Sequence, residues 1–185
     1  MYNTSTKTIT TKRLILRPFT LSDSSDLATL CNNINLSKSM ISLPYPYTND
    51  HAVSWISTHE ENFDNNTYYS FAITDKTTGT LYGSVGISHK IANKHGEIGY
   101  WIGEPYWGNN YATEACEAVL AFAFVHKGYN KVFGIYFSSN TASGTIMKKI
   151  GMVQEGTLKE HILKNNKYED VVQYGITRSL YLADR

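Results

Sequence analysis

The segment Gly99–Phe124, GYWIGEPYWGNNYATEACEAVLAFAF, limits the possible folds of this chain more than any other stretch. Its first residues are apolar and aromatic, as in a strand, and the Gly and Asn residues that follow are typical of a turn. The residues after the turn recur at three- and four-residue steps, which predicts a helix with one buried face. That face is formed by Ala112, Ala115, Cys116, Val119, Phe122 and Ala123, and Gly128 follows as a candidate C-cap.

The turn before this helix has the composition of a phosphate-binding loop. The first turn of a helix leaves backbone N–H groups without partners and carries a partial positive charge, so an anion is favoured there. Gly108, Asn109 and Asn110 adopt positive φ more easily than most residues, which lets the backbone approach a ligand. We therefore expect a pyrophosphate group where the helix begins, near Tyr111.

Two common phosphate-binding motifs are absent from the loop. The chain contains no Gly-Lys-Ser or Gly-Lys-Thr, which excludes a P-loop, and Asn110 and Thr113 break the glycine pattern of the dinucleotide-binding fingerprint. Other carriers of a diphosphate remain. From this stretch alone, the alternative that the loop is a simple connection also stays open.

Composition predicts a single domain over residues 1–185, located in the cytoplasm. Of the 185 residues 42% are hydrophobic and 18% charged, and the net charge of +1 gives no overall attraction to nucleic acid or to a membrane surface. Two cysteines are too few for a disulfide framework, and the six histidines lack the spacing of zinc ligands, so we expect no metal. Met1–Thr11 is polar and lacks the apolar core of a secretion signal; residues 1–10 are expected to be a loose segment.

Strand and helix patterns fill the rest of the chain without a repeat or a linker. Strands are expected at Lys12–Pro18, Tyr68–Thr74, Thr80–Lys90, Gly96–Ile102, Lys131–Phe137, Met152–Leu163 and Tyr168–Thr177. Helices are expected from Ser22 or Asp23 to Asn32, after Asn49 or Asp50, from Tyr111, and over Asn140–Ile150, with an ordered loop over Leu36–Asn49. We predict an α+β fold in which helices pack on a mixed, mostly antiparallel sheet of six or seven strands.

Several segments together resemble one enzyme family. GEIGYWIGEPYWGNNYATEA is similar to the cofactor-binding segment of the GNAT superfamily of acyl-CoA-dependent N-acyltransferases, and in particular to its ribosomal-protein N-terminal acetyltransferase branch. The resemblance continues in order through KRLILRPFTLSD, LPYPYTNDHAVSWI, SSNTASGTIMKKIGMVQEG and KYEDVVQYGI, and covers roughly Thr11 to Thr177. It implies the GNAT fold, with helices on both faces of the sheet, and acetyl-CoA as co-substrate.

The resemblance also implies where acetyl-CoA binds. Its pyrophosphate would rest on the loop and helix start formed by Trp107, Gly108, Asn109, Asn110, Tyr111, Ala112 and Thr113. The pantetheine arm would lie along Tyr100, Trp101 and Ile102, in a splay between that strand and Lys131–Phe137, and would contact Asn140. The chain departs from the usual family motif at Trp107, which replaces a polar residue, and at Asn110, which replaces a glycine. We expect Asn110 to take the left-handed conformation, at a small cost in free energy.

Transfer to a protonated amine requires a base, and Glu97 is the first candidate, either directly or through a water molecule. Ser143 matches the family's serine that protonates the departing thiolate. Backbone N–H groups of Tyr100–Ile102 would hold the oxyanion. The alternatives are a solvent-facing carboxylate for Glu97 and an ordinary first-turn helix residue for Ser143. Cys116 lies on the buried helix face without a histidine beside it, so we expect a buried thiol rather than a nucleophile.

The acceptor side is less defined by the sequence. Tyr45, Tyr47 and Trp55 belong to the segment that forms one wall of the acceptor site in the family, and Tyr168 lies near the hairpin that often forms the other. The leading hypothesis is acetylation of the N-terminal amine of a ribosomal or other protein, by direct attack in a ternary complex. The alternatives are a small amine (a polyamine, an antibiotic or an amino-acid derivative) and a non-catalytic acyl-CoA-binding module, and the protein could be a monomer or a homodimer.

Overall fold

The computed structural model describes residues 1–183, and its strands form one nine-stranded sheet in the order β1-β2-β3-β4-β5-β6-β7-β9-β8. The strands are β1 (Tyr2–Asn3), β2 (Thr8–Thr10), β3 (Leu14–Arg17), β4 (Tyr68–Asp75), β5 (Leu81–Ser88), β6 (His95–Ile102), β7 (Lys131–Phe137), β8 (Val153–Lys164) and β9 (Lys167–Thr177). All neighbouring strands are antiparallel except β6 and β7, which are parallel. This confirms the predicted mixed, mostly antiparallel sheet.

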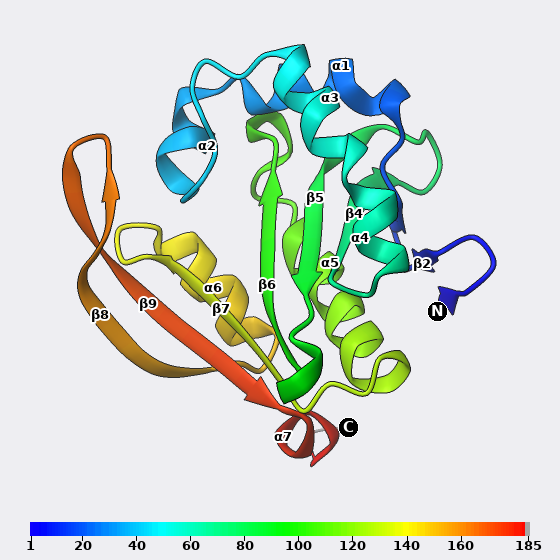
Figure 1. The fold of residues 1–185 in the computed structure, drawn as a ribbon, viewed down its shortest axis with the longest axis vertical. Helices are drawn as coiled ribbons and strands as arrows, with labels where there is room; N and C mark the ends of the chain where they lie inside the picture. Colours follow the sequence, from blue (N-terminus) through cyan, green and yellow to red (C-terminus); the bar gives the residue numbers. More distant parts are fainter. Residues whose placement is uncertain (184–185) are drawn as a thin grey trace.

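Helices cover both faces of the sheet, as expected (Figure 1). They are α1 (Ser24–Cys31), α2 (Ile34–Ser39), α3 (Asn49–Ser57), α4 (His59–Asp64), α5 (Tyr111–Ala121), α6 (Thr141–Lys149) and α7 (Arg178–Ala183), and a π-helical turn at Phe122–His126 extends α5. Helix α5 packs on one face. Helices α1, α2 and α3 pack on the other, where a second apolar cluster joins Leu27, Leu36 and Ile56 to Trp101 of β6.

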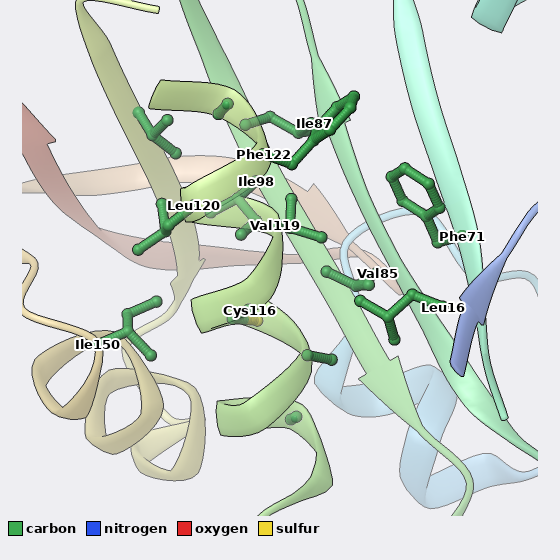
Figure 2. Packing of buried hydrophobic residues seen from close by; sticks show 14 of the residues in the cluster. Leu16, Phe71, Val85, Ile87, Ile98, Cys116, Val119, Leu120, Phe122 and Ile150 are labelled. Carbon is green, nitrogen blue, oxygen red and sulfur yellow. The ribbon is translucent and has the colours of Figure 1, made fainter. Parts of the chain in front are cut away.

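The buried face predicted for α5 is the centre of the main core. Cys116, Val119 and Phe122 face strand residues such as Val85 and Ile98 (Figure 2). All six residues of the predicted stripe are buried, since none is more than 8% exposed. The periodicity of the sequence therefore identified both the helix and the side that packs on the sheet.

The sheet has nine strands rather than the six or seven predicted. The two additional strands, β1 and β2, lie in residues 1–10, which were expected to be loose. They pair with each other and with β3, and Ile9 is 3% exposed in the core. The amino group of Met1 also donates a hydrogen bond to the Thr10 carbonyl, at 2.7 Å. These strands were missed because they are two and three residues long and mostly polar, too short for a recognisable alternation.

The stretch Leu36–Asn49 is also more regular than predicted at its start. Helix α2 covers Ile34–Ser39, and the side chain of Asn33 caps it by accepting hydrogen bonds from the backbone N–H groups of Asn35 and Leu36. Only the part after α2 is the ordered loop that the two prolines indicated. Residues 40–43 of this loop line two cavities beside β6.

Strands β6 and β7 separate soon after they meet. They pair only at His95–Lys131, Gly96–Val132 and Glu97–Phe133, and beyond these pairs β6 is bonded to β5 alone. Figure 1 shows the two strands diverging from their shared lower end. The side of β6 that faces β7 thus has no strand partner from Ile98 onward. No helix in residues 1–183 is long and apolar enough to cross a membrane.

Candidate active site

A cavity of about 720 Å³ opens where β6 and β7 diverge, bounded by the start of α5 and by α6. All residues predicted for catalysis or cofactor binding line it: Glu97, Tyr100, Trp101, Ile102, Trp107, Gly108, Asn109, Asn110, Tyr111, Ala112, Thr113, Asn140 and Ser143. We call this space the donor cavity. The resemblance therefore selected residues that the fold brings together from four separate elements.

The start of α5 has the geometry expected of an anion site. Asn110 is the N-cap in the left-handed conformation, with φ 60° and ψ 18°, and Gly108 also has a positive φ, of 78°. The Asn110 side chain does not cap the helix. Within residues 1–183, the backbone N–H groups of Tyr111, Ala112 and Thr113 have no hydrogen-bond partner. These groups form the free positive end of the helix dipole.

Lys149 is a residue at this end of the cavity that the sequence reasoning missed. Its ammonium group donates a hydrogen bond to Asn110 Oδ1 at 3.0 Å. Asn110 is the N-cap of α5, and Lys149 is the last residue of α6. Lys149 and Glu97 are the two charged side chains among the described residues that line the donor cavity. The positive charge thus lies at the helix start and the negative charge at the far end of β6. Lys149 reaches this part of the cavity because α6 packs beside α5, a tertiary contact that the sequence does not show.

Trp107 anchors the loop instead of presenting a polar ligand. Its indole N–H donates to the Ile102 carbonyl at 2.6 Å, and Asn109 Nδ2 donates to the carbonyls of Tyr106 and Trp107, both at 3.1 Å. These bonds fix the loop against the end of β6. The departure from the family motif at Trp107 therefore has a structural role here.

Glu97 lies at the last residue pair that joins β6 to β7. Its backbone N–H donates to Ser88 Oγ at 2.9 Å, and its side chain is partly buried. Burial raises the pKa of the Glu97 carboxyl above its usual value, and the nearby charge of Lys90 acts in the opposite direction. A raised pKa makes the carboxylate a stronger base.

Hydrogen bonds connect Tyr100 of β6 with Asn140 and Ser143 at the start of α6. Asn140 Oδ1 accepts from the Ser143 backbone N–H at 3.3 Å, and its Nδ2 donates to the Ser39 carbonyl at 3.2 Å. Tyr100 donates its hydroxyl to the Ser143 carbonyl at 3.1 Å. Asn140 is the N-cap of α6, so Ser143 does lie in the first turn of a helix, but that turn faces the donor cavity.

A second cavity of about 480 Å³ lies on the other side of β6, beneath α1 and α3. We call it the acceptor cavity. The two cavities share the lining residues Met40, Ser42, Gly99, Tyr100 and Trp101, so they meet at the middle of β6. Aromatic side chains dominate the acceptor cavity, namely Tyr47, Trp55, Tyr68, Tyr100 and Trp101, and no carboxylate is among its described lining residues.

The acceptor residues predicted from the sequence are only partly brought together. Tyr47 and Trp55 line the acceptor cavity. Tyr45 and Tyr168 line neither cavity and are 53% and 61% exposed. The structure therefore does not bring Tyr45, in the loop after α2, or Tyr168, on β9, together with Tyr47 and Trp55 in this cavity.

Comparison with known proteins identifies the family. The sequence model of the acetyltransferase (GNAT) domain matches residues 13–153. The chain belongs to the GNAT acetyltransferase family. As a GNAT protein it is an acetyl-CoA-dependent N-acetyltransferase, and acetyl-CoA is its co-substrate.

Individual relatives agree on the family but differ in their acceptors. The chain is 28% identical to an uncharacterized N-acetyltransferase, YoaA, of Bacillus subtilis over 91% of this chain and 95% of that protein. Its fold matches the structure of RimL, a ribosomal L7/L12 alpha-N-protein acetyltransferase in complex with coenzyme A, with a TM-score of 0.85 and 19% identity over 92% and 97% of the two chains. It also matches spermidine N-acetyltransferase of Vibrio cholerae in complex with CoA and spermine, with a TM-score of 0.81 and 22% identity over 93% and 99%.

Metal ligands and reactive thiols do not contribute to the described site of this acetyltransferase. Residues 1–183 contain no group of three or more His, Cys, Asp or Glu side chains arranged to hold a metal ion. Cys116 is fully buried in the core, and burial raises its pKa well above the usual value. Cys31 lines the acceptor cavity, but burial raises its pKa to about 12, so its thiol stays protonated at neutral pH.

His59 is a buried histidine behind the acceptor wall. Its ring packs edge-on against Trp55, with centroids 4.2 Å apart, and also contacts Phe19. Neither ring nitrogen has a hydrogen-bond partner among residues 1–183, and burial lowers the pKa of His59 to about 4 from 6.5. The folded state therefore binds a proton at His59 less readily than the unfolded state does.

This difference predicts a specific pH dependence of stability. The free energy of unfolding should be highest above about pH 6.5 and should fall as pH drops from 6.5 toward 4, because in that range only the unfolded chain gains a proton at His59. His59→Leu should reduce the loss of unfolding free energy between pH 7 and pH 4 by about 3 kcal/mol. Urea unfolding at the two pH values measures it, with the exposed His161→Leu as control. Equal losses in wild type and His59→Leu would contradict the prediction.

Residues 40–43 form a loop that borders both cavities, and a lysine from a distant strand holds it. Lys164, at the end of β8, donates from its ammonium group to the carbonyls of Met40, Ile41 and Leu43. Burial lowers the pKa of Lys164. Asn140, the N-cap of α6, also donates a hydrogen bond to the carbonyl of Ser39, the residue just before the loop. The loop is therefore held by β8 through Lys164 and by α6 through Asn140.

We expect Lys164→Met to release this loop without unfolding the protein. Methionine keeps an apolar stem of similar length but removes three charge-assisted hydrogen bonds. Amide hydrogen exchange in residues 40–43 should become at least about tenfold faster. Lys159→Met is the control, because Lys159 is on the same strand and bonds to Asp170 instead of the loop. Unchanged exchange in Lys164→Met would show that other contacts hold the loop.

Proposed function

We propose that this acetyltransferase transfers the acetyl group of acetyl-CoA to the N-terminal amine of a protein, with a ribosomal protein as the leading acceptor, by direct attack in a ternary complex in the cytoplasm. The observation that carries the proposal is the meeting of the donor and acceptor cavities at Gly99–Trp101 of β6. A thioester in one cavity and an amine in the other would come into contact there.

The roles of the donor-cavity residues follow from their positions. The unpartnered N–H groups at the start of α5, together with Lys149, would bind the pyrophosphate of acetyl-CoA. The pantetheine arm would lie along the free edge of β6, past Tyr100–Ile102 and close to Asn140. Backbone N–H groups on β6 would hold the oxyanion of the tetrahedral intermediate.

The chemistry requires two proton transfers. The amine must lose a proton before its lone pair can attack the thioester carbon, and Glu97 is the proposed base. When the carbon–sulfur bond breaks, the thiolate of coenzyme A must gain a proton, and Ser143 is the proposed donor. Both residues line the donor cavity, Glu97 from β6 and Ser143 from α6.

The acceptor cavity favours a peptide amine over a polyamine. A spermidine-like acceptor carries several positive charges, which need carboxylate partners when they leave water. No carboxylate is among the described residues that line the acceptor cavity, where aromatic rings and hydroxyls predominate. The same aromatic lining supports a second candidate, a small aromatic or apolar monoamine.

A panel of amines separates these candidates. Purified protein with acetyl-CoA is offered peptides that begin with Ser, Ala or Met, 2-phenylethylamine, and spermidine, and thiol release is followed together with the mass of the product. We expect a peptide to give the highest kcat/KM. A higher kcat/KM for 2-phenylethylamine would favour the second candidate, and a higher kcat/KM for spermidine would refute the charge argument. If none of these amines gives thiol release, the proposed transfer is refuted.

A further inference from the structure

Glu97 does not line the cavity proposed to hold the acceptor amine. Glu97 lines the donor cavity and is absent from the described lining of the acceptor cavity. A base in the first cavity must therefore receive its proton from an amine in the second. A group at the boundary between the two cavities can carry that proton.

Tyr68 lies on the acceptor side of this boundary. It is the first residue of β4, and its ring lines the acceptor cavity. The hydroxyl lies directly over Gly86 of β5: a Cβ atom added at Gly86 would stand 2.2 Å from it. Gly86 pairs with Gly99 of β6, the residue that lines both cavities. The missing side chain of Gly86 thus leaves room for a phenol hydroxyl beside the point where donor and acceptor meet.

Tyr68 and Glu97 also project from the same face of the sheet. Tyr68 pairs with Ser88 across β4 and β5, and Ser88 Oγ accepts the backbone N–H of Glu97 across β5 and β6. Side chains of residues directly opposite in a ladder share a face. Gly86 pairs with Gly99, and Ser88 and Glu97 each lie two residues from that pair, so the side chains of Tyr68, Ser88 and Glu97 emerge on one face, with the Tyr68 hydroxyl over Gly86.

The electrostatics of the pair suit proton transfer toward Glu97. Burial, and next the charge of Glu97, raise the pKa of Tyr68, so its hydroxyl stays protonated at working pH and can donate. Burial also raises the pKa of Glu97, while Lys90 opposes that shift. The phenol is therefore a proton donor within electrostatic range of a carboxylate of increased basicity.

We propose that Tyr68 is a catalytic residue that relays the proton of the acceptor amine to Glu97. This inference rests on the proposed function. In the relay, the ammonium group gives a proton to Tyr68 Oη while the phenol gives its own proton to a Glu97 carboxylate oxygen. Glu97 becomes neutral, Tyr68 is unchanged, and the freed lone pair of the amine attacks the thioester carbon. No metal, oxidant or covalent intermediate is needed.

The kinetic test uses Tyr68→Phe, which keeps the ring over Gly86 and removes only the hydroxyl. With a Ser-initiated peptide and with 2-phenylethylamine, kcat/KM at pH 7 should fall about 10- to 100-fold, while the Kd for acetyl-CoA stays the same. The deficit should shrink as pH rises, because an amine that is already deprotonated needs no relay. The double variant Tyr68→Phe/Glu97→Gln should be no slower than Glu97→Gln alone. Tyr2→Phe, on the far edge of the sheet, is the matched control and should keep wild-type rates.

A second measurement tests the pair without turnover. The Tyr68 phenol should titrate at a lower pH in Glu97→Gln than in wild type, followed by the ¹³C signal of its Cζ atom, because the neighbouring negative charge is gone. An unshifted titration, a Tyr68→Phe deficit that is the same at every pH, or additive losses in the double variant would each overturn the relay. If wild type acetylates a probe and Tyr68→Phe does so equally well at pH 7, only the relay fails. If wild type acetylates no amine of the panel, the proposed function fails and the relay with it.

Discussion

Glu97→Gln is expected to lower kcat for acetyl transfer to the best amine of the panel by about 100- to 1,000-fold at pH 7. Glutamine has a similar shape but cannot accept a proton, so the acceptor must find another base or wait for the small deprotonated fraction. An α-amine has a pKa of about 7.7–8.0 and a lysine-like amine about 10.4, so the loss should be larger for the second kind. The Kd for acetyl-CoA should change little, since glutamine fills the same space at the end of the donor cavity.

The pKa of Glu97 determines how the rate should depend on pH. Burial raises the pKa of Glu97, so the wild-type rate should fall as pH drops through a value above the usual range of a glutamate. In Glu97→Gln this acid limb should vanish, and the residual rate should rise with pH as the free amine accumulates. Glu117→Gln, on the exposed side of α5, is the matched control. Wild-type turnover in Glu97→Gln would assign the base role to another residue or to water.

Asn110→Val should weaken acetyl-CoA binding about 10- to 30-fold, measured by calorimetric titration. At φ 60° a β-branched side chain is strongly disfavoured, so the backbone before α5 must either move or remain strained. In both cases the N–H groups of Tyr111, Ala112 and Thr113 lose their present alignment. Valine also removes the oxygen that Lys149 Nζ contacts.

Two matched variants separate these effects. Asn110→Gly allows the same φ, and its affinity should be equal to that of wild type or better, to within about threefold. Asn66→Val introduces the same conformational conflict, at φ 55°, in a residue that lines neither cavity, so it should lower stability without changing the Kd. Equal affinities for wild type, Asn110→Gly and Asn110→Val would refute the assignment of this loop to the cofactor.

Local patterns in the sequence predicted the start of α5 and the loop before it. The left-handed Asn110, the N-terminal end of α5 and its buried stripe all depend on residues within one short segment. The same segment carries the resemblance that led to the family. By contrast, β1 and β2 depend on pairing with β3, and short polar strands leave no periodic signal.

Residues that act through tertiary contact were not predictable in this way. Lys149 reaches Asn110 only because α6 packs beside the end of α5, and Lys164 reaches residues 40–43 across more than a hundred positions of sequence. Tyr45 and Tyr47 are two residues apart, yet only Tyr47 faces the acceptor cavity. Which of two neighbouring aromatic residues turns inward depends on the path of the loop between α2 and α3, and no local pattern specifies that path.

The early end of the β6–β7 ladder has a broader consequence. An unpaired strand edge on the outside of a protein invites other chains to add to the sheet. Here the unpaired edge lies inside the molecule, between two strands that remain joined at their base, so a small molecule can be held by peptide groups while foreign strands are kept out. Peptide groups along this edge keep their hydrogen-bonding capacity whichever side chains they carry. The acceptor cavity is lined instead by side chains of α1 and α3 such as Leu27 and Trp55, so substitutions there can change the preferred amine while this strand edge stays the same.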